Sequence, residues 1–231
     1  MSWLGPDGWT AVLLSLKVSF WAVFLSLPFS IAIAWILARK DFVGKQVVNG
    51  LVHLPLILPP VVTGYILLMI LGRNAPVGAF LEQYLGIVVA FRWTGAAVAA
   101  AVMAFPLTVR AIRLAIEAVN PGLEDAASTL GASRVRVFFT ITLPLIVPGI
   151  IAGVVMGFAK AMGEFGATIT FVSAIPGRTQ TLPSAIYGQL QVPGGEDLAL
   201  RLVLVSVVVA MAALVVSEVV SRRVARRIAG Q

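Results

Sequence analysis

The stretch PGLEDAASTLGASRVRVFFTITLP, residues 121–144, is polar and charged, yet it lies between two apolar segments long enough to cross a membrane. Asn120 is a suitable N-cap for a helix that begins at Pro121, because proline at the first helical position loses no hydrogen bond. Gly131 is a natural stop, since glycine adopts the left-handed conformation without steric cost. Ser133 can then cap a second helix. The pattern therefore predicts two short helices joined by a tight turn.

An apolar stripe follows the first of these helices at the spacing i, i+3, i+4, i+7, formed by Leu123, Ala126, Ala127 and Leu130. Because two of its members are alanine, the backbone of a partner could come close. Pro144 is expected to open the next helix, which is a membrane span.

The composition is that of an integral membrane protein. Of the 231 residues, 59% are hydrophobic and 12% are charged, whereas a soluble domain carries roughly 25% charged residues. The absence of cysteine excludes disulfides, thiolate metal sites and cysteine nucleophiles. A net charge of +7 indicates basic cytoplasmic loops in such a protein and gives no reason to expect nucleic acid.

Five apolar segments reach the length of about 20 residues that a helix needs to cross a membrane. We expect one all-α domain over residues 1–231, with a polar loop at 117–143 and spans at about 10–38, 46–71, 94–116, 144–165 and 198–219.

The second span contains Pro55, Pro59 and Pro60, which predict a bent or broken helix. Two interpretations stay open: a broken helix that lines a transport path, or a static kink that helps the helices to pack.

The fourth span carries three glycines at a spacing of four, Gly149, Gly153 and Gly157, which favours close helix packing, including packing between two copies of the chain. Lys160 and Glu164 are also four apart and can form an ion pair.

The basic residues predict the orientation through the positive-inside rule. Eleven lie on one side of the five spans, namely Arg39, Lys40, Lys45, Arg110, Arg113, Arg134, Arg136, Arg222, Arg223, Arg226 and Arg227, and four on the other, namely Arg73, Arg92, Arg178 and Arg201. The N-terminus is therefore expected outside, and the C-terminus and the 117–143 loop in the cytoplasm.

Enzyme chemistry has no residues to support it. The phosphate-binding pattern G-x-x-x-x-G-K-[ST] is missing, as are H-E-x-x-H and any cluster with metal-ligand spacing, and the chain has one histidine. We expect no catalytic residue, no metal and no cofactor bound by this chain.

The loop resembles the cytoplasmic loop of ABC-importer permeases, in which E-A-A, three residues, G, nine residues and I-x-L-P follow one another. Here Asp125-Ala126-Ala127, Gly131 and Ile141-Thr142-Leu143-Pro144 keep the spacing throughout, with aspartate in place of glutamate. The segments His53-Leu54-Pro55, Leu58-Pro59-Pro60-Val61-Val62 and Gly163-Glu164-Phe165-Gly166-Ala167-Thr168 look like the molybdate branch of these permeases. Sulfate/thiosulfate permeases share parts of the motifs but tend to be longer.

The resemblance implies a five-span permease of the type I importer fold in the bacterial inner membrane, which moves molybdate or tungstate. Its partners would be a second copy, an ATP-binding subunit that carries ATP and Mg²⁺ on the cytoplasmic side, an extracytoplasmic oxyanion-binding protein, and lipid. The residues implied in coupling to the ATPase are Glu124, Asp125, Ala126, Ala127, Leu130, Gly131, Arg134, Leu143 and Pro144. Those favoured for the translocation path are Pro59, Pro60, Thr63, Met103, Pro106, Lys160, Glu164 and Thr168.

Three alternative functions are a sulfate/thiosulfate permease, a secondary transporter and a membrane scaffold. Secondary transporters usually show inverted repeats, which this sequence lacks. A scaffold has no need of three prolines in one span or of a structured cytoplasmic helix pair.

Overall fold

The computed structural model describes residues 3–228 and, over that range, consists of helices and connecting turns. The helices are α1 (Gly5–Arg39), α2 (Lys45–Ile57), α3 (Pro60–Leu71), α4 (Pro76–Leu85), α5 (Trp93–Ala118), α6 (Pro121–Thr129), α7 (Arg134–Val137), a π-helical turn (Phe138–Thr142), α8 (Leu143–Met162), α9 (Gly166–Val172), α10 (Leu182–Leu190) and α11 (Glu196–Ile228). Residues 1–2 and 229–231 of the expected domain lie outside the described part, as do the side chains of Arg222, Arg226 and Arg227.

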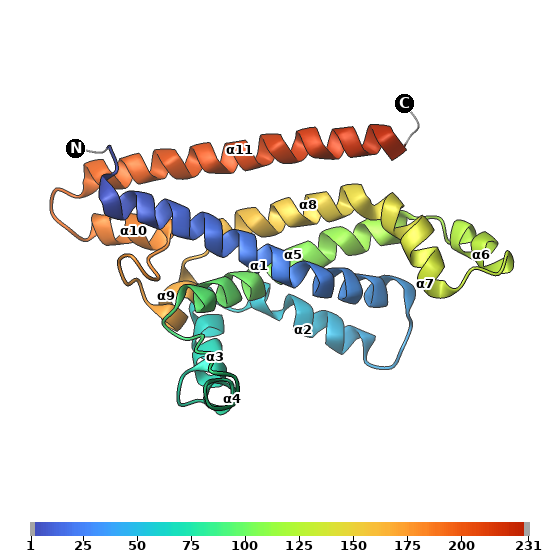
Figure 1. Ribbon diagram of the computed structural model, residues 1–231, viewed down its shortest axis with the longest axis horizontal. Helices are drawn as coiled ribbons and strands as arrows, with labels where there is room; N and C mark the ends of the chain where they lie inside the picture. Colours follow the sequence, from blue (N-terminus) through green and yellow to red (C-terminus); the bar gives the residue numbers. More distant parts are fainter. Residues whose placement is uncertain (1–2, 229–231) are drawn as a thin grey trace.

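Within residues 3–228, four helices are long and apolar enough to cross a membrane, and the bent pair α2 and α3 makes a fifth if the two are counted as one span. The long helices run side by side along the longest axis of the molecule (Figure 1). One end carries α9 and α10, and the other carries α6 and α7. The axis of this bundle is therefore the direction in which the chain crosses the bilayer.

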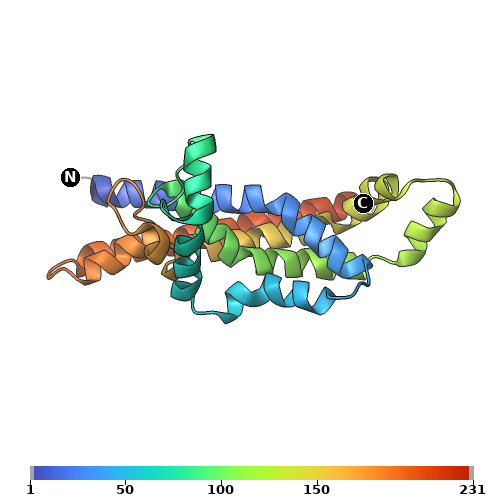
Figure 2. The ribbon, with the colours of Figure 1, turned by 90° about the horizontal axis from the view of Figure 1, so that it is seen from below.

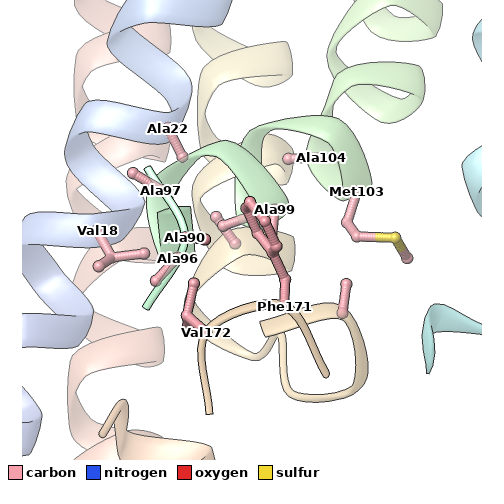
Figure 3. Close-up of a cluster of buried hydrophobic side chains, with 13 residues drawn as sticks. Val18, Ala22, Ala90, Ala96, Ala97, Ala99, Met103, Ala104, Phe171 and Val172 are labelled. Carbon is pink, nitrogen blue, oxygen red and sulfur yellow. The ribbon is translucent and has the colours of Figure 1, made fainter. Parts of the chain in front are cut away.

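Helix α5 is the centre of the bundle: 61% of its most apolar window is buried, against 11% for α11. Its alanines, among them Ala96, Ala99 and Ala100, let α1 and α8 approach closely. The same cluster contains Met103 and the fully buried Phe171 of α9 (Figure 3). A core of small side chains thus fixes the helix positions by close backbone contact.

The break that the three prolines predict is present between α2 and α3, which are bent by 113° to each other. Leu58 is extended, as expected of a residue that precedes a proline, and Pro60 is the first residue of α3. None of the residues of α2 is buried. Seen at right angles to the first view, α3 and α4 stand across the bundle (Figure 2).

The 72–93 connection contains α4, and Arg73, which precedes this helix, bonds to a residue near its C-terminal end. The Arg73 guanidinium donates to both carboxylate oxygens of Glu82, with Nε–Oε1 2.9 Å and Nε–Oε2 3.0 Å. These hydrogen bonds hold the pKa of the Glu82 carboxyl below its usual range. Phe80 and Tyr84 pack against each other on the exposed side, with ring centroids 4.7 Å apart.

The three glycines of α8 face the interior of the subunit. A Cβ at Gly149 would meet Ala115 of α5, one at Gly153 would lie 3.2 Å from the carbonyl oxygen of Thr108, and one at Gly157 would lie 2.5 Å from the Thr108 hydroxyl. The spacing left open that this face packs against a second copy of the chain. That option is wrong. Helix α5 already occupies this face.

Candidate coupling loop and translocation path

The 121–144 stretch folds as two short helices with the expected caps. The Asn120 side chain accepts a hydrogen bond from the Gly122 N–H at 2.9 Å, and the Ser133 hydroxyl accepts one from the Arg136 N–H at 3.3 Å. Gly131 has a φ of +84°, and the turn is closed by the Gly131 N–H to the Ser128 carbonyl at 3.0 Å. The loop is held by its own local hydrogen bonds.

One face of this loop is open. Leu130 is 88% exposed and Leu123 is 50% exposed, while Ala126 and Asp125 are exposed beside them. Arg134, the first residue of α7, is also exposed. Large apolar side chains in water at the tip of a polar loop indicate a surface that another protein covers.

Pro144 lies in the first turn of α8, as expected, but α8 is not separate from the helix before it. Helices α7 and α8 form one continuous helix over Arg134–Met162, interrupted by the π-helical turn Phe138–Thr142. The Leu143 N–H bonds to the Phe138 carbonyl, five residues back. This widened turn takes up the interruption that a proline introduces, so the helix continues past Pro144 instead of starting there. Leu143 is partly buried against a core cluster that includes Leu37, Ile112 and Ile146.

Glu124 points inward, unlike its neighbour Asp125. Its carboxylate forms an ion pair with Arg39 at the end of α1, with Nε–Oε2 3.1 Å, and accepts a hydrogen bond from the Thr142 hydroxyl at 2.6 Å. The side chains of Arg39 and Glu124 are 15% and 19% exposed. Glu124 is therefore not part of the open face.

Lys160 and Glu164 form the expected ion pair at the C-terminal end of α8, with Nζ–Oε2 3.2 Å. The Glu164 side chain is 2% exposed and that of Lys160 is 30% exposed. Glu164 also accepts a hydrogen bond from the Ala167 N–H at 2.9 Å, in the first turn of α9. A buried carboxylate in a membrane helix bundle marks a functional site by default, because its burial is costly.

Helix α9 meets the first turn of α3. A Cβ at Gly166 would lie 2.7 Å from the Pro60 Cβ, and one at Gly64 would lie 2.5 Å from the Ala167 carbonyl oxygen. Pro60, Glu164 and Thr168 thus come from abutting segments. Pro59 and Pro60 are exposed, and Thr63 is buried with a hydroxyl that has no hydrogen-bond partner among the described residues.

Met103 and Pro106 lie in the interior of the subunit instead of on a surface. Met103 is 2% exposed and packs in the alanine-rich cluster (Figure 3), and Pro106 is also buried. Of the eight expected path residues, these two are the ones that belong to the packed centre of α5.

Two residues of the site were missed at the level of sequence, Arg39 and Thr142. Arg39 counted only as a loop cation, and Thr142 occupies the variable position of I-x-L-P. Arg39 also donates to the Val119 carbonyl at 3.0 Å, at the end of α5. No spacing rule links Arg39 to Glu124, which lies 85 residues further along the chain.

Comparison with known proteins identifies a family and relatives of this chain. The family described as "Binding-protein-dependent transport system inner membrane component" matches residues 26–230. The "Molybdenum transport system permease protein ModB" of Escherichia coli (strain K12) is 61% identical over 199 residues, which cover 86% of this chain and 87% of that protein. The "Sulfate transport system permease protein CysT" of Salmonella typhimurium is 36% identical over 80% of this chain and 67% of its own length.

The fold is shared with a solved structure. A bacterial ABC transporter involved in the import of the acidic polysaccharide alginate superposes with a TM-score of 0.73, 21% identity, and coverage of 96% of this chain and 85% of that one. The likeness concerns the arrangement of helices and says nothing of the substrate.

Proposed function

The chain belongs to the family of binding-protein-dependent transport system inner membrane components, and on that premise we propose that it is the permease subunit of an ABC importer for molybdate. It is a multi-pass protein of the inner membrane. One observation carries the substrate assignment: the chain is 61% identical to a molybdenum permease over 86% of its length, against 36% to a sulfate permease.

The open face of α6 supports docking of a separate ATP-binding subunit on the cytoplasmic side. Leu123, Ala126 and Leu130 offer apolar surface, and Asp125 and Arg134 offer charges around it. ATP and Mg²⁺ would be held by that partner. ATP can drive transport only if the docked subunits bind the outward-open and inward-open states with different affinity.

A second copy of the chain is expected to complete the transport path. The grooves of about 490 Å³ and 420 Å³ on the flanks of the bundle are lined almost wholly by apolar side chains, so neither suits a dianion. Helix α2 buries none of its residues, although it lies beside the bundle (Figure 1). Two copies that meet along α2 and α3 would cover this helix and enclose a path.

The path chemistry follows from Lys160. It is the cation nearest the buried carboxylate of Glu164, and 30% of its side chain is exposed. A molybdate dianion in a low-dielectric path needs positive charge and hydrogen-bond donors, yet must be bound weakly enough to leave. Pairing with Glu164 reduces the positive potential that Lys160 presents to the anion, which keeps binding weak. An oxyanion-binding protein would deliver the substrate from outside, where α4 and α10 lie.

The function is tested by uptake into proteoliposomes that hold the permease, its ATP-binding subunit and the binding protein. We expect labelled molybdate to accumulate only when ATP is present on the side of the membrane that the ATP-binding subunit faces. Unlabelled tungstate should compete, because the two oxyanions have nearly the same size and charge, and sulfate should compete at least tenfold less.

The same assay separates the alternatives. Competition by sulfate as strong as that by molybdate would assign the chain to sulfate transport. Uptake by the permease alone, without the ATP-binding subunit, would make it a secondary transporter. A matched control is the complex without Mg²⁺, which should bind the substrate-loaded binding protein but accumulate nothing.

A further inference from the structure

Three side chains join the cytoplasmic ends of four helical segments. The Glu124 carboxylate of α6 contacts Arg39 at the end of α1, with Nε–Oε2 3.1 Å and Nη2–Oε1 3.3 Å. It also accepts from the Thr142 hydroxyl at 2.6 Å, at the foot of α8. Arg39 in turn donates to the Val119 carbonyl at the end of α5 at 3.0 Å. We refer to Arg39, Glu124 and Thr142 as the cytoplasmic linkage.

Glu124 differs from the other polar residues of α6 in the partner of its side chain. The hydroxyls of Ser128 and Thr129 bond to carbonyls of α6 itself, at 2.9 Å and 2.7 Å, and Asn120 caps the helix locally. Within the part of the chain that the structure describes, Glu124 is the one side chain of residues 121–129 that hydrogen-bonds to a membrane-spanning helix. Displacement of α6 therefore reaches the bundle through this carboxylate and through the covalent chain.

The two ends of the linkage differ in stiffness. Arg39 ends α1, whose last turns are buried with α5 through Leu37, Val109 and Ile112. Thr142 instead ends the π-helical turn, where the regular hydrogen-bond ladder of the helix is interrupted. Such turns are points at which helices bend and are frequent at functional sites. A pull on Glu124 would thus tilt α8, which carries Lys160, against a firm α1–α5 pair.

We propose, on the basis of the proposed function, that Glu124 is a positioning residue that transmits movement of the docked α6 to α1 and α8, and that it does not contact the ATP-binding subunit. Its neighbour Asp125, which is exposed, is the acid available for that contact. Two adjacent carboxylates in the loop then have separate tasks, one for docking and one for transmission.

The test compares Glu124→Ala with wild type in the complete transporter in proteoliposomes. The ATP-binding subunit should still co-purify, because the open face is unchanged, and ATP should still be hydrolysed. The ratio of ATP hydrolysed to molybdate imported should rise about tenfold, within the usual range of coupling between sites. Glu124→Gln keeps an oxygen that accepts from Thr142 but lacks the negative charge that pairs with Arg39. Its ratio of ATP hydrolysed to molybdate imported should therefore be intermediate.

A second readout needs no substrate. In the purified permease, hydrogen exchange of the backbone at 121–129 and 138–142 should become faster in Glu124→Ala, since α6 and the π-helical turn lose their common anchor. The matched control is Asp41→Asn, which removes an exposed acid at the same end of the molecule, paired with Lys45 at 2.9 Å. It should leave both the ratio and the exchange at 121–129 unchanged.

An unchanged ratio in Glu124→Ala would overturn the proposal, and so would loss of the ATP-binding subunit with unchanged exchange, because Glu124 would then be a docking residue. If wild type shows no ATP-driven molybdate uptake, the proposed function fails instead. In that case the exchange measurement still decides whether Glu124 joins α6 to the bundle: unaltered exchange in Glu124→Ala refutes it.

Discussion

The ion pair of Lys160 and Glu164 links the stability of the subunit to the proposed transport path. Glu164 is almost completely buried, whereas Lys160 keeps 30% of its side chain exposed. Removing one partner of a buried pair leaves an uncompensated charge, which costs more than the pair itself contributes. The carboxylate also accepts a hydrogen bond from the Ala167 N–H in the first turn of α9, so it anchors that helix as well as Lys160.

We therefore expect Lys160→Gln to lower the free energy of unfolding by up to about 3 kcal/mol, at the low end for a buried pair because Lys160 is partly exposed. The double variant Lys160→Gln/Glu164→Gln should recover most of that loss, since no charge is left unpaired. Thermal unfolding of the purified permease measures both variants.

Uptake in the double variant should stay low, because the cation of the path is still missing. Recovery of uptake together with stability would mean that Lys160 serves only to neutralise Glu164. A Lys160→Gln variant as stable as wild type would show that Lys160 does not stabilise the buried Glu164 carboxylate.

At the scale of elements, close packing of α8 against α5 depends on glycine. A Cβ at Gly149 would collide with the Cβ of Ala115, and neither atom is the end of a flexible side chain that could move aside. Interiors that are already close-packed do not accept an extra methyl group without a shift of backbone or side chains.

Gly149→Ala should accordingly lower the free energy of unfolding by about 1–3 kcal/mol, the usual cost of overpacking. The control is Gly163→Ala at the C-cap of α8, where the new Cβ would lie 3.6 Å from the Ala159 carbonyl oxygen, an ordinary contact. Thermal unfolding of the two variants side by side is the measurement. Equal midpoints would contradict the observed α5–α8 contact.

At the scale of the whole molecule, the two ends of the bundle have different tasks. The α6 loop lies at one end, and α9 and α10 lie at the other, with α3 and α4 standing across the bundle near that second end (Figures 1 and 2). The distribution of basic residues predicts that the α6 end is cytoplasmic. The proposed docking of an ATP-binding subunit depends on this orientation.

The absence of cysteine makes the orientation directly testable. Ala126→Cys on α6 and Gln83→Cys on α4 both introduce an exposed thiol. With the permease expressed alone, a membrane-impermeant maleimide should label Gln83→Cys in spheroplasts and Ala126→Cys only after the membrane is permeabilised. Labelling of Ala126→Cys from outside would refute the orientation and, with it, the docking of an ATPase on this loop.

Much of the fold could be predicted because its signals are local. Hydropathy marks the long helices, since a helix in a membrane must be apolar around most of its surface, and Pro59-Pro60 marks the break in the second span. The caps of α6 and α7 could be predicted for the same reason, because each bonds to a backbone N–H two or three residues away.

Predictions that depended on the surroundings of a residue were less successful. Pro144 has the character of a helix start, yet a π-helical turn just before it lets the helix continue. The glycines of α8 favour close packing with any helix, and the sequence does not say that α5 is the partner. Glu124 and Asp125 are adjacent carboxylates in the loop sequence, and the structure turns the first inward and leaves the second exposed.

By itself, the sequence determined an all-helical membrane protein with a structured polar loop between two spans, because apolar length and local capping act within one or two turns of a helix. The tertiary structure alone decided that Glu124 meets Arg39, 85 residues away, and that the α8 glycines pack against α5. Those contacts depend on the rotation of each helix about its axis, which is set by the packing of the whole bundle.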